Sequence, residues 1–176
     1  MIEDEVTVRR VDADGAAACV EALADVLVEC VEGGASVSFM HPLPRAKSVA
    51  FWRGVADGVA RGERVLLVAE DREGRIVGTV QMITAQPDNQ PHRADIVKML
   101  VRRSARRRGI AQRLMAAIDD AARTEGKSVL VLDAVTGGDA ERLYQRAGWQ
   151  RVGSVPNYAL MPDGAFCATT FYYKQL

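Results

Sequence analysis

The sequence has no excess of either charge and no long apolar run. Its 176 residues include 23 Lys and Arg against 23 Asp and Glu, so the formal net charge is zero. A balanced chain has no overall positive field that would hold it on nucleic acid or on an anionic membrane. It also lacks a run of about 18 apolar residues that could span a bilayer. We therefore expect a small-molecule partner, with neither nucleic acid nor a membrane involved.

Cysteine and histidine are scarce and widely separated. The three cysteines, Cys19, Cys30 and Cys167, lack the close spacing of a zinc or redox motif, and we interpret them as small buried hydrophobic residues. His41 and His92 lie in separate loops, so we expect no metal site. An odd number of thiols suits a reducing cytosol, and the acidic N-terminus does not resemble a secretory signal. We therefore expect a cytoplasmic protein.

The hydrophobic pattern of the first half predicts strands and helices in alternation. Hydrophobic residues make up 48% of the chain, enough for one core, and we expect a single domain over residues 1–176. Val6 and Val8 alternate with polar residues in a first strand. Apolar residues at helical spacing then predict two helices, with a loop at residues 33–44 between them. The predicted segments are a helix over residues 16–31, a helix marked by Val49, Trp52, Val55 and Val59, and an antiparallel hairpin of residues 64–70 and 76–84.

The second half predicts a parallel strand pair joined by a helix. Residues 94–101 form a strand, residues 109–125 a helix that buries Ile110, Leu114, Ile118 and Ala121, and residues 128–133 an almost unbroken apolar strand. Such a run is typical of a strand that is covered on both faces. A short helix at residues 139–147 and strands at residues 150–155 and 166–174 follow. The predicted class is α/β with a mixed sheet.

The loop that enters the helix at residues 109–125 suits a phosphate. Arg106, Gly109 and Ala111 lie where backbone amides and the positive end of the helix dipole converge, and the two small residues leave the approach open. Neither a Walker loop nor a Gly-x-Gly-x-x-Gly fingerprint is present. A pyrophosphate ligand other than a nucleoside triphosphate or a nicotinamide cofactor is therefore expected.

This segment resembles the GNAT acetyltransferase superfamily. The superfamily loop reads Arg or Gln, two residues, Gly, one residue, then Gly or Ala, as Arg106, Gly109 and Ala111 do here. Three further segments resemble family elements in the family's order: residues 94–101, residues 129–133, and the Ala-x-x-Leu-Tyr helix that leads to Gly148 and Trp149. The resemblance implies a mixed, mostly antiparallel sheet flanked by helices, with the fourth and fifth strands parallel and splayed apart.

The same resemblance implies an enzyme that uses acetyl-CoA as co-substrate, which would lie in the opening between those two strands. Backbone groups of the fourth strand would contact the pantetheine arm and the thioester carbonyl, and the loop would hold the pyrophosphate. The residues implied are Met99, Leu100 and Val101 in the strand, and Arg106, Arg107, Arg108, Gly109, Ile110, Ala111 and Gln112 in the loop and helix.

Three residues are candidates for acid–base catalysis. Asp95 lies where the superfamily often has a catalytic Glu and is our first choice as general base, although Arg93 could simply balance its charge. Asp133 is the rival, because sites gather at the carboxyl ends of buried strands, but it could instead cap the next turn. By resemblance, Tyr144 would point at the cofactor sulfur and protonate it. Its alternative role is core packing.

The acceptor is less constrained. Residues 33–40, 156–164 and 171–174 resemble the tabtoxin-resistance type of acetyltransferase, which implies a small β-lactam antimetabolite toxin as acceptor and a role in antibiotic resistance. Other amines remain open as acceptors, namely a polyamine, an amino acid or a protein N-terminus, as do a non-catalytic acyl-CoA-binding module and a homodimer. A nucleic-acid adaptor built on the arginines is a weaker alternative. Candidate substrate contacts are Ser36, Phe39, His41, His92 and Tyr158.

Overall fold

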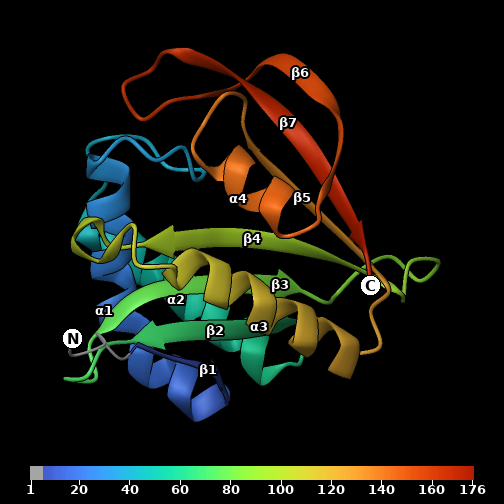
Figure 1. The fold of residues 1–176 in the computed structure, drawn as a ribbon. Helices are drawn as coiled ribbons and strands as arrows, with labels where there is room; N and C mark the ends of the chain where they lie inside the picture. The colour runs from blue at the N-terminus through green and yellow to red at the C-terminus, as the bar shows by residue number, and fades with distance from the viewer. Residues whose placement is uncertain (1–5) are drawn as a thin grey trace.

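A seven-stranded mixed sheet organises residues 6–176, the part of the chain that the computed structural model describes (Figure 1). The acidic N-terminal segment considered above lies outside these residues. The strand order is β1-β2-β3-β4-β5-β7-β6, and β4 and β5 form the parallel pair among antiparallel neighbours. The predicted fold class is confirmed. The strands are β1 (Thr7–Val11), β2 (Arg64–Glu70), β3 (Ile76–Ile83), β4 (Arg93–Val101), β5 (Val129–Val135), β6 (Gln150–Leu160) and β7 (Phe166–Gln175).

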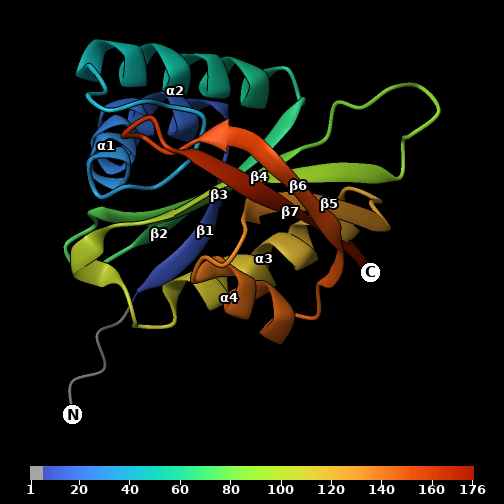
Figure 2. The ribbon, with the colours of Figure 1, turned by 90° about the horizontal axis from the view of Figure 1, so that it is seen from above.

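Helices cover the sheet on both faces (Figure 2). Helices α1 (Ala13–Glu32) and α2 (Arg45–Ala60) pack together on one face, over β1 to β4. Helix α3 (Ile110–Thr124) and the short α4 (Ala140–Arg146) lie on the other. A 3₁₀ turn, η1 (Arg103–Ala105), links β4 to α3. Within residues 6–176 no helix is long and apolar enough to cross a membrane.

The local signals in the sequence account for most element boundaries. Helix α1 begins where the Asp12 carboxylate accepts a hydrogen bond from the Gly15 N–H at 2.8 Å, an N-cap that satisfies an otherwise unpaired donor. The β2–β3 hairpin turns at Gly74, whose φ of 74° favours glycine. Both predicted helices of the first half bury the residues expected of them, except that Val59 is only partly buried.

Three details of the second half differ from the prediction. Helix α3 buries Ala122 and leaves Ala121 half-buried, because the buried stripe continues from Ile118 by four residues. Strand β5 alternates in burial instead of being covered on both faces, since α1 and α2 reach only β1 to β4. Strand β6 continues to Leu160, past the predicted end at residue 155. Pro156 does not stop it because β6 is an edge strand, where a missing N–H is tolerated.

The parallel pair β4 and β5 separates soon after it begins. Residues 93–95 of β4 pair with residues 129–131 of β5, and beyond them β5 pairs only with β7. Strand β4 stays with β3, where the register shifts between Thr79 and Gln81 and Lys98 takes a φ of 54°. Such a shift is a β-bulge, which bends the strand that carries it. The two strands diverge in Figure 1, and we call the opening between them the splay. The predicted splaying of the fourth and fifth strands is confirmed.

A buried ion pair joins α3, α4 and β7. The Lys174 ammonium on β7 contacts the Asp119 carboxylate on α3 and donates to the Ala147 carbonyl at the end of α4, at 2.6 Å from it. Both side chains of the pair are less than one fifth exposed, at 17% and 12%. The Asp119 Oδ1 atom has no hydrogen-bond partner within the described residues. Lys174 is therefore the main group that offsets the cost of burying the Asp119 carboxylate.

Removing Lys174 alone should destabilise the protein. Because Lys174→Met leaves the Asp119 charge buried without a partner, we expect it to lower the free energy of unfolding by about 3 kcal/mol, measured by urea denaturation. The double variant Lys174→Met/Asp119→Leu should be more stable than Lys174→Met. Arg123→Met is the control, since it breaks an exposed ion pair and should cost less than about 1 kcal/mol. A comparably small loss in Lys174→Met would mean that Asp119 does not depend on this contact.

Candidate active site

The loop before α3 presents an open helix N-terminus. Gly109 takes a φ of 73° at the N-cap, and no side chain caps the helix there. A Cβ atom placed on Gly109 would meet nothing within 4 Å. The first N–H groups of a helix have no partner inside the helix and carry its positive dipole end. The start of α3 is therefore an uncapped group of donors with open space beside it.

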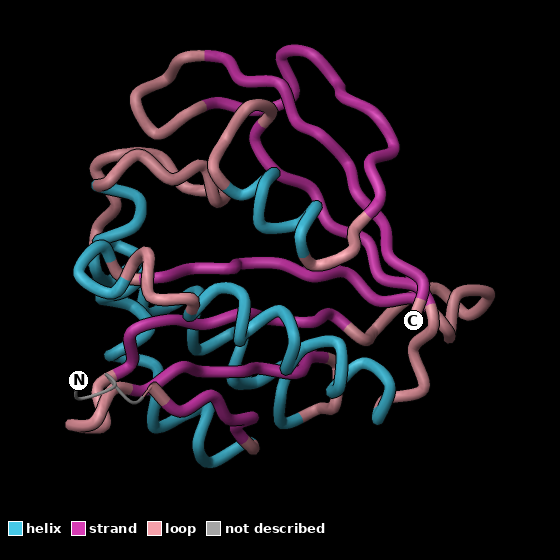
Figure 3. The backbone as a smooth tube through the Cα atoms, viewed as in Figure 1, coloured by secondary structure: helices cyan, strands magenta, loops and turns pink. Residues whose placement is uncertain are grey.

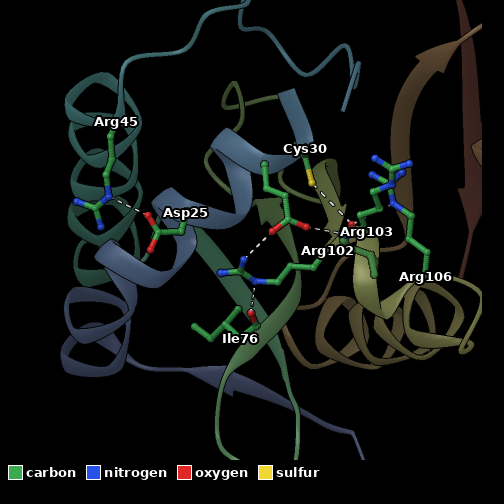
Figure 4. Close-up of polar contacts among 9 residues, drawn as sticks. Asp25, Cys30, Arg45, Ile76, Arg102, Arg103 and Arg106 are labelled. Carbon is green, nitrogen blue, oxygen red and sulfur yellow. Dashed lines mark hydrogen bonds and ion pairs between the residues drawn. The ribbon is translucent and has the colours of Figure 1, made fainter. Parts of the chain in front are cut away.

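A carboxylate from α1 fixes the base of this loop (Figure 4). Glu29 accepts hydrogen bonds from the Arg102 guanidinium at 2.6 Å and from the Arg103 backbone N–H at 2.8 Å. Arg102 also donates to the Ile76 carbonyl at 3.0 Å. Arg102 thus has structural partners, and its guanidinium is engaged within the protein. The sequence analysis did not identify Glu29. A negative side chain in the last turn of a helix is repelled by the negative end of the helix dipole, so its presence there indicates a positively charged partner.

The end of β4 is held by two further donors from outside the strand. The Val101 carbonyl accepts from the Cys30 thiol at 3.7 Å and from the Arg106 guanidinium at 3.3 Å. Burial raises the pKa of the Cys30 thiol, so it stays protonated and can donate. Two hydrogen bonds occupy both lone pairs of the Val101 carbonyl. Of the three predicted strand contacts, Met99 and Leu100 are left with more freedom to bind a ligand.

Asp95 lies on β4 inside a polar network. Its carboxylate is paired with the Arg93 guanidinium and also accepts from the Gln86 side chain at 3.0 Å. Arg93 donates in turn to Gln90 at 2.7 Å. Both carboxylate oxygens of Asp95 therefore have donors, and the ion pair with Arg93 considered from the sequence is present.

Asp133 lies on the neighbouring strand β5, without such donors. Within residues 6–176 its side chain has no ion pair and no hydrogen bond to another side chain. It is reached by solvent, yet protein atoms surround it closely enough that burial raises the pKa of its carboxyl. The Lys98 ammonium opposes that rise in pKa and the Asp95 carboxylate adds to it. Asp133 is thus an accessible carboxylate whose pKa responds to one positive and one negative neighbour.

Tyr144 of α4 is buried beside the same carboxylate. Its ring packs against Trp149 and Tyr172, with centroids 6.2 and 5.7 Å away. Burial raises the pKa of Tyr144 to about 12, and the nearby Asp133 charge adds to the rise. The phenol is therefore protonated at neutral pH. Tyr144 belongs to the core and also lies within electrostatic reach of Asp133, so the two roles considered from the sequence are compatible.

The loop of residues 33–44 and the β6–β7 hairpin meet near the splay (Figure 3). Ser36 donates its hydroxyl to the Leu160 carbonyl at 3.1 Å, and the His41 backbone N–H donates to the Pro162 carbonyl at 3.0 Å. Both residues thus join these two segments. His92 lies just before β4, six residues from Lys98 and so about 20 Å along the strand. The structure does not bring His92 to this group.

Aromatic side chains line the surroundings of Asp133. Phe171 on β7 pairs directly with Asp133, so the two side chains share a face of the sheet. Tyr158 packs edge-to-face on Phe171, with ring centroids 5.6 Å apart. Phe39 packs in the same manner on Phe51 of α2 at 5.3 Å. Of these rings, the sequence analysis named Phe39 and Tyr158 but missed Phe51 and Phe171, which only the tertiary fold identifies.

Two surface hollows lie elsewhere. The two hollows have volumes of about 450 and 350 Å³ and are lined in part by residues of β1. Arg10 and Glu125, which form an ion pair, both line the larger hollow. They lie at the opposite edge of the sheet from β6 and contain none of the carboxylates discussed above. The splay, which has the uncapped start of α3 on one side and Asp133 with Tyr144 on the other, remains the candidate site.

Comparison with known proteins agrees with this geometry. A sequence profile of the Acetyltransferase (GNAT) family matches residues 21–149, which include the loop, β4, β5 and α4. The chain belongs to the GNAT acetyltransferase family. A relative from Azospirillum brasilense, named as an uncharacterized N-acetyltransferase of the hisH-hisA intergenic region, is 32% identical over 113 residues. That match covers 63% of this chain and 65% of the relative.

Solved structures share the fold at low sequence identity. One is yncA from Salmonella typhimurium, described as a putative acetyltransferase with its cofactor acetyl-CoA. It is 20% identical, with a TM-score of 0.79 and coverage of 98% of this chain and 94% of that one. Another is a GCN5-related N-acetyltransferase from Kribbella flavida, 23% identical, with a TM-score of 0.79 and coverage of 97% and 98%. The similarity extends over nearly the whole GNAT fold.

Proposed function

We propose that this protein transfers the acetyl group of acetyl-CoA to an amine of a small molecule. The observation that carries the proposal is the splay, which has an uncapped helix N-terminus at one side and an acid–base pair, Asp133 and Tyr144, beside it. Membership of the GNAT family supports the same reaction. A transfer by direct attack of the acceptor needs no acyl-enzyme, so no nucleophilic side chain is required.

The residues around the splay fit acetyl-CoA. The N–H groups that begin α3, together with Arg106 to Gln112, would hold the pyrophosphate, because an open helix N-terminus favours anions. Met99 and Leu100 lie on the part of β4 that β5 leaves unpaired, and Val101, whose carbonyl Cys30 and Arg106 engage, ends it. When bound, acetyl-CoA supplies an acetyl group activated as a thioester. The acetyl-CoA described in the Salmonella structure, which has the same fold, supports this choice of ligand.

Asp133 is the better placed general base. A base must accept the proton of an ammonium acceptor, whose free pKa is about 10, before or during attack. Asp133 has no partner among the other side chains of residues 6–176, only its own backbone N–H, and burial raises its pKa, so it holds a proton more readily than an ordinary Asp. Asp95, our first choice from the sequence, is held by Arg93 and Gln86. We assign Asp95 the role of a fixed anion that adds a little to the rise in the pKa of Asp133, which is caused mainly by burial.

Tyr144 would act as the general acid. Its hydroxyl is protonated at neutral pH and can donate to the departing sulfur.

The identity of the acceptor is defined only as a class of molecule. The resemblance of residues 33–40 and 156–164 to tabtoxin-resistance acetyltransferases supports a β-lactam amino acid, and acetylation would then detoxify it. The other acceptors considered above, such as polyamines, can be tested by comparing the rate at which each one causes release of the free thiol from acetyl-CoA.

The two carboxylates should respond differently to amide substitution. We expect Asp133→Asn to lower kcat/KM for an amine by about 100-fold or more, because general-base help is lost. In Asp95→Asn, the pH at which activity rises should move to a lower value, since removing a negative neighbour makes Asp133 easier to ionise. The measurement is thiol release across pH with one acceptor for all variants.

Exchange of these two results would overturn the assignment. If Asp95→Asn removes the acidic limb of the profile while Asp133→Asn keeps it, the base is Asp95. Asn is the matched substitution at both positions, because it keeps the shape of the side chain and removes only the charge.

Tyr144→Phe should slow the chemical step without weakening acetyl-CoA binding. Phe keeps the ring that packs on Trp149 and Tyr172 and removes only the hydroxyl. We expect a loss of about 100-fold or somewhat less in single-turnover rate, since a thiolate leaves partly unaided. A single-turnover rate equal to that of wild type would exclude the acid role and leave Tyr144 as a core residue.

A further inference from the structure

Lys98 is held on β4 in a conformation that its residue type disfavours. Its φ of 54° lies in the left-handed region, which non-glycine residues rarely adopt. It occupies the bulge of β4, where Val97 pairs with Gln81 and Leu100 with Thr79, so that Lys98 and Met99 share the interval opposite one residue of β3. Strained backbone of this kind is concentrated at functional sites. The disfavoured backbone conformation of Lys98, beside the splay, therefore suggests a functional role for this residue.

The Lys98 ammonium has no charged partner within residues 6–176. It donates to the Ser38 hydroxyl at 3.0 Å and lies 5.7 Å from the centroid of the Phe51 ring. An ammonium has three donors, and one of them is used. Burial lowers the pKa of Lys98, which reflects the cost of enclosing a charge without a counter-charge. An anion from outside the protein would remove that cost.

The other cation that acts on the pKa of Lys98 is Arg64, and it already has a partner, because it donates to the Gln81 side chain at 2.9 Å. Lys98 and Asp133 influence each other's pKa, which places the two charges near one another without a direct ion pair. One positive and one negative group therefore face the acceptor side of the splay, each lacking an opposite charge in contact.

We propose that Lys98 binds a carboxylate of the acceptor, so that the acceptor is an amino-acid-like zwitterion whose amine meets Asp133. This inference rests on the acetyltransferase function proposed above and narrows its substrate class. The Phe39–Phe51 and Tyr158–Phe171 pairs supply apolar walls for the rest of such a molecule. A polyamine would bring a second ammonium toward Lys98, and like charges in a partly buried site repel. The arrangement thus selects against polyamines.

The test compares acceptors that differ only at the carboxylate. Thiol release from acetyl-CoA is measured with a panel of free amino acids, including β-lactam amino acids, with the carboxamide of each, and with spermidine. For wild type, we expect kcat/KM to be about 10-fold or more higher for at least one free acid than for its carboxamide, because the carboxamide loses a charge-assisted hydrogen bond. Spermidine should be a poorer acceptor than that acid.

Lys98→Met keeps the length of the side chain and removes its charge. We expect kcat/KM for the free acid to fall by about 10- to 100-fold, and the ratio of acid to carboxamide activity to fall with it. That ratio separates carboxylate binding from any effect on Asp133, because both acceptors depend on the same base. Lys98→Arg, which keeps the charge, should retain part of the preference. Lys47→Met changes an exposed lysine of α2, 6.0 Å from the Phe39 ring, and should leave the ratio unchanged.

The outcomes separate this inference from the proposed function. Equal use of acids and carboxamides by wild type, turnover of spermidine alone, or an equal loss on both acceptors in a folded Lys98→Met would overturn the carboxylate site while leaving acetyl transfer intact. Folding of each variant is checked by its thermal unfolding and its KM for acetyl-CoA. If wild type neither binds acetyl-CoA nor releases thiol with any acceptor, the acetyltransferase function fails, and the carboxylate site fails with it.

Discussion

Hydrogen bonding between β4 and β5 stops after residues 95 and 131, and the arrangement of the candidate site depends on this interruption. Strand β4 stays paired with β3 and strand β5 with β7, so each strand keeps its outer neighbour while the facing edges of β4 and β5 separate. Backbone groups on the facing edges are left for water or a ligand. The helix that connects the strands begins beside the same opening, so its uncapped amides lie where an extended anionic ligand would end.

The two sides of the splay are joined through the end of α1. Glu29 holds the backbone of Arg103 in the phosphate-facing loop, and Cys30 holds the Val101 carbonyl. The chain then continues directly into the loop of residues 33–44, where Ser38 contacts Lys98 and Ser36 contacts the β6–β7 hairpin. Order in the cofactor loop and order in the acceptor loop therefore depend on one helix terminus.

Local and contiguous signals were sufficient to predict the fold and to suggest the loop before α3 as a cofactor site. Helical periodicity identified α1, α2 and α3, and the spacing of Arg106, Gly109 and Ala111 identified the loop, because each signal lies within a few residues of sequence. The acceptor side could not be predicted in this way. Its side chains come from α2, β4, β5, β7 and two loops, and strict alternation along β4 does not foresee the bulge that sets the direction of Lys98.

Partners also distinguish two carboxylates that the sequence analysis ranked with Asp95 first and Asp133 second. Asp95 and Asp133 are both aspartates at strand positions near the site, and only the structure shows that Arg93 and Gln86 engage the first. The arginines near residue 106 looked alike for the same reason, yet Arg102 is committed to Glu29. The partner of Arg102 is 73 residues away in sequence, and the partners of Asp95 are nearby in sequence but are brought into contact by a loop, so neither set could be assigned from sequence spacing alone.

Amide hydrogen exchange with and without acetyl-CoA tests most directly whether the splay is the cofactor site. The account predicts slower exchange for amides of residues 99–101 and 109–112 in wild type and in Gly109→Ala. No such protection is predicted in Gly109→Glu, which directs a negative side chain into the open space before α3. Unchanged exchange in these segments at saturating acetyl-CoA, or protection along β1 instead, would contradict it.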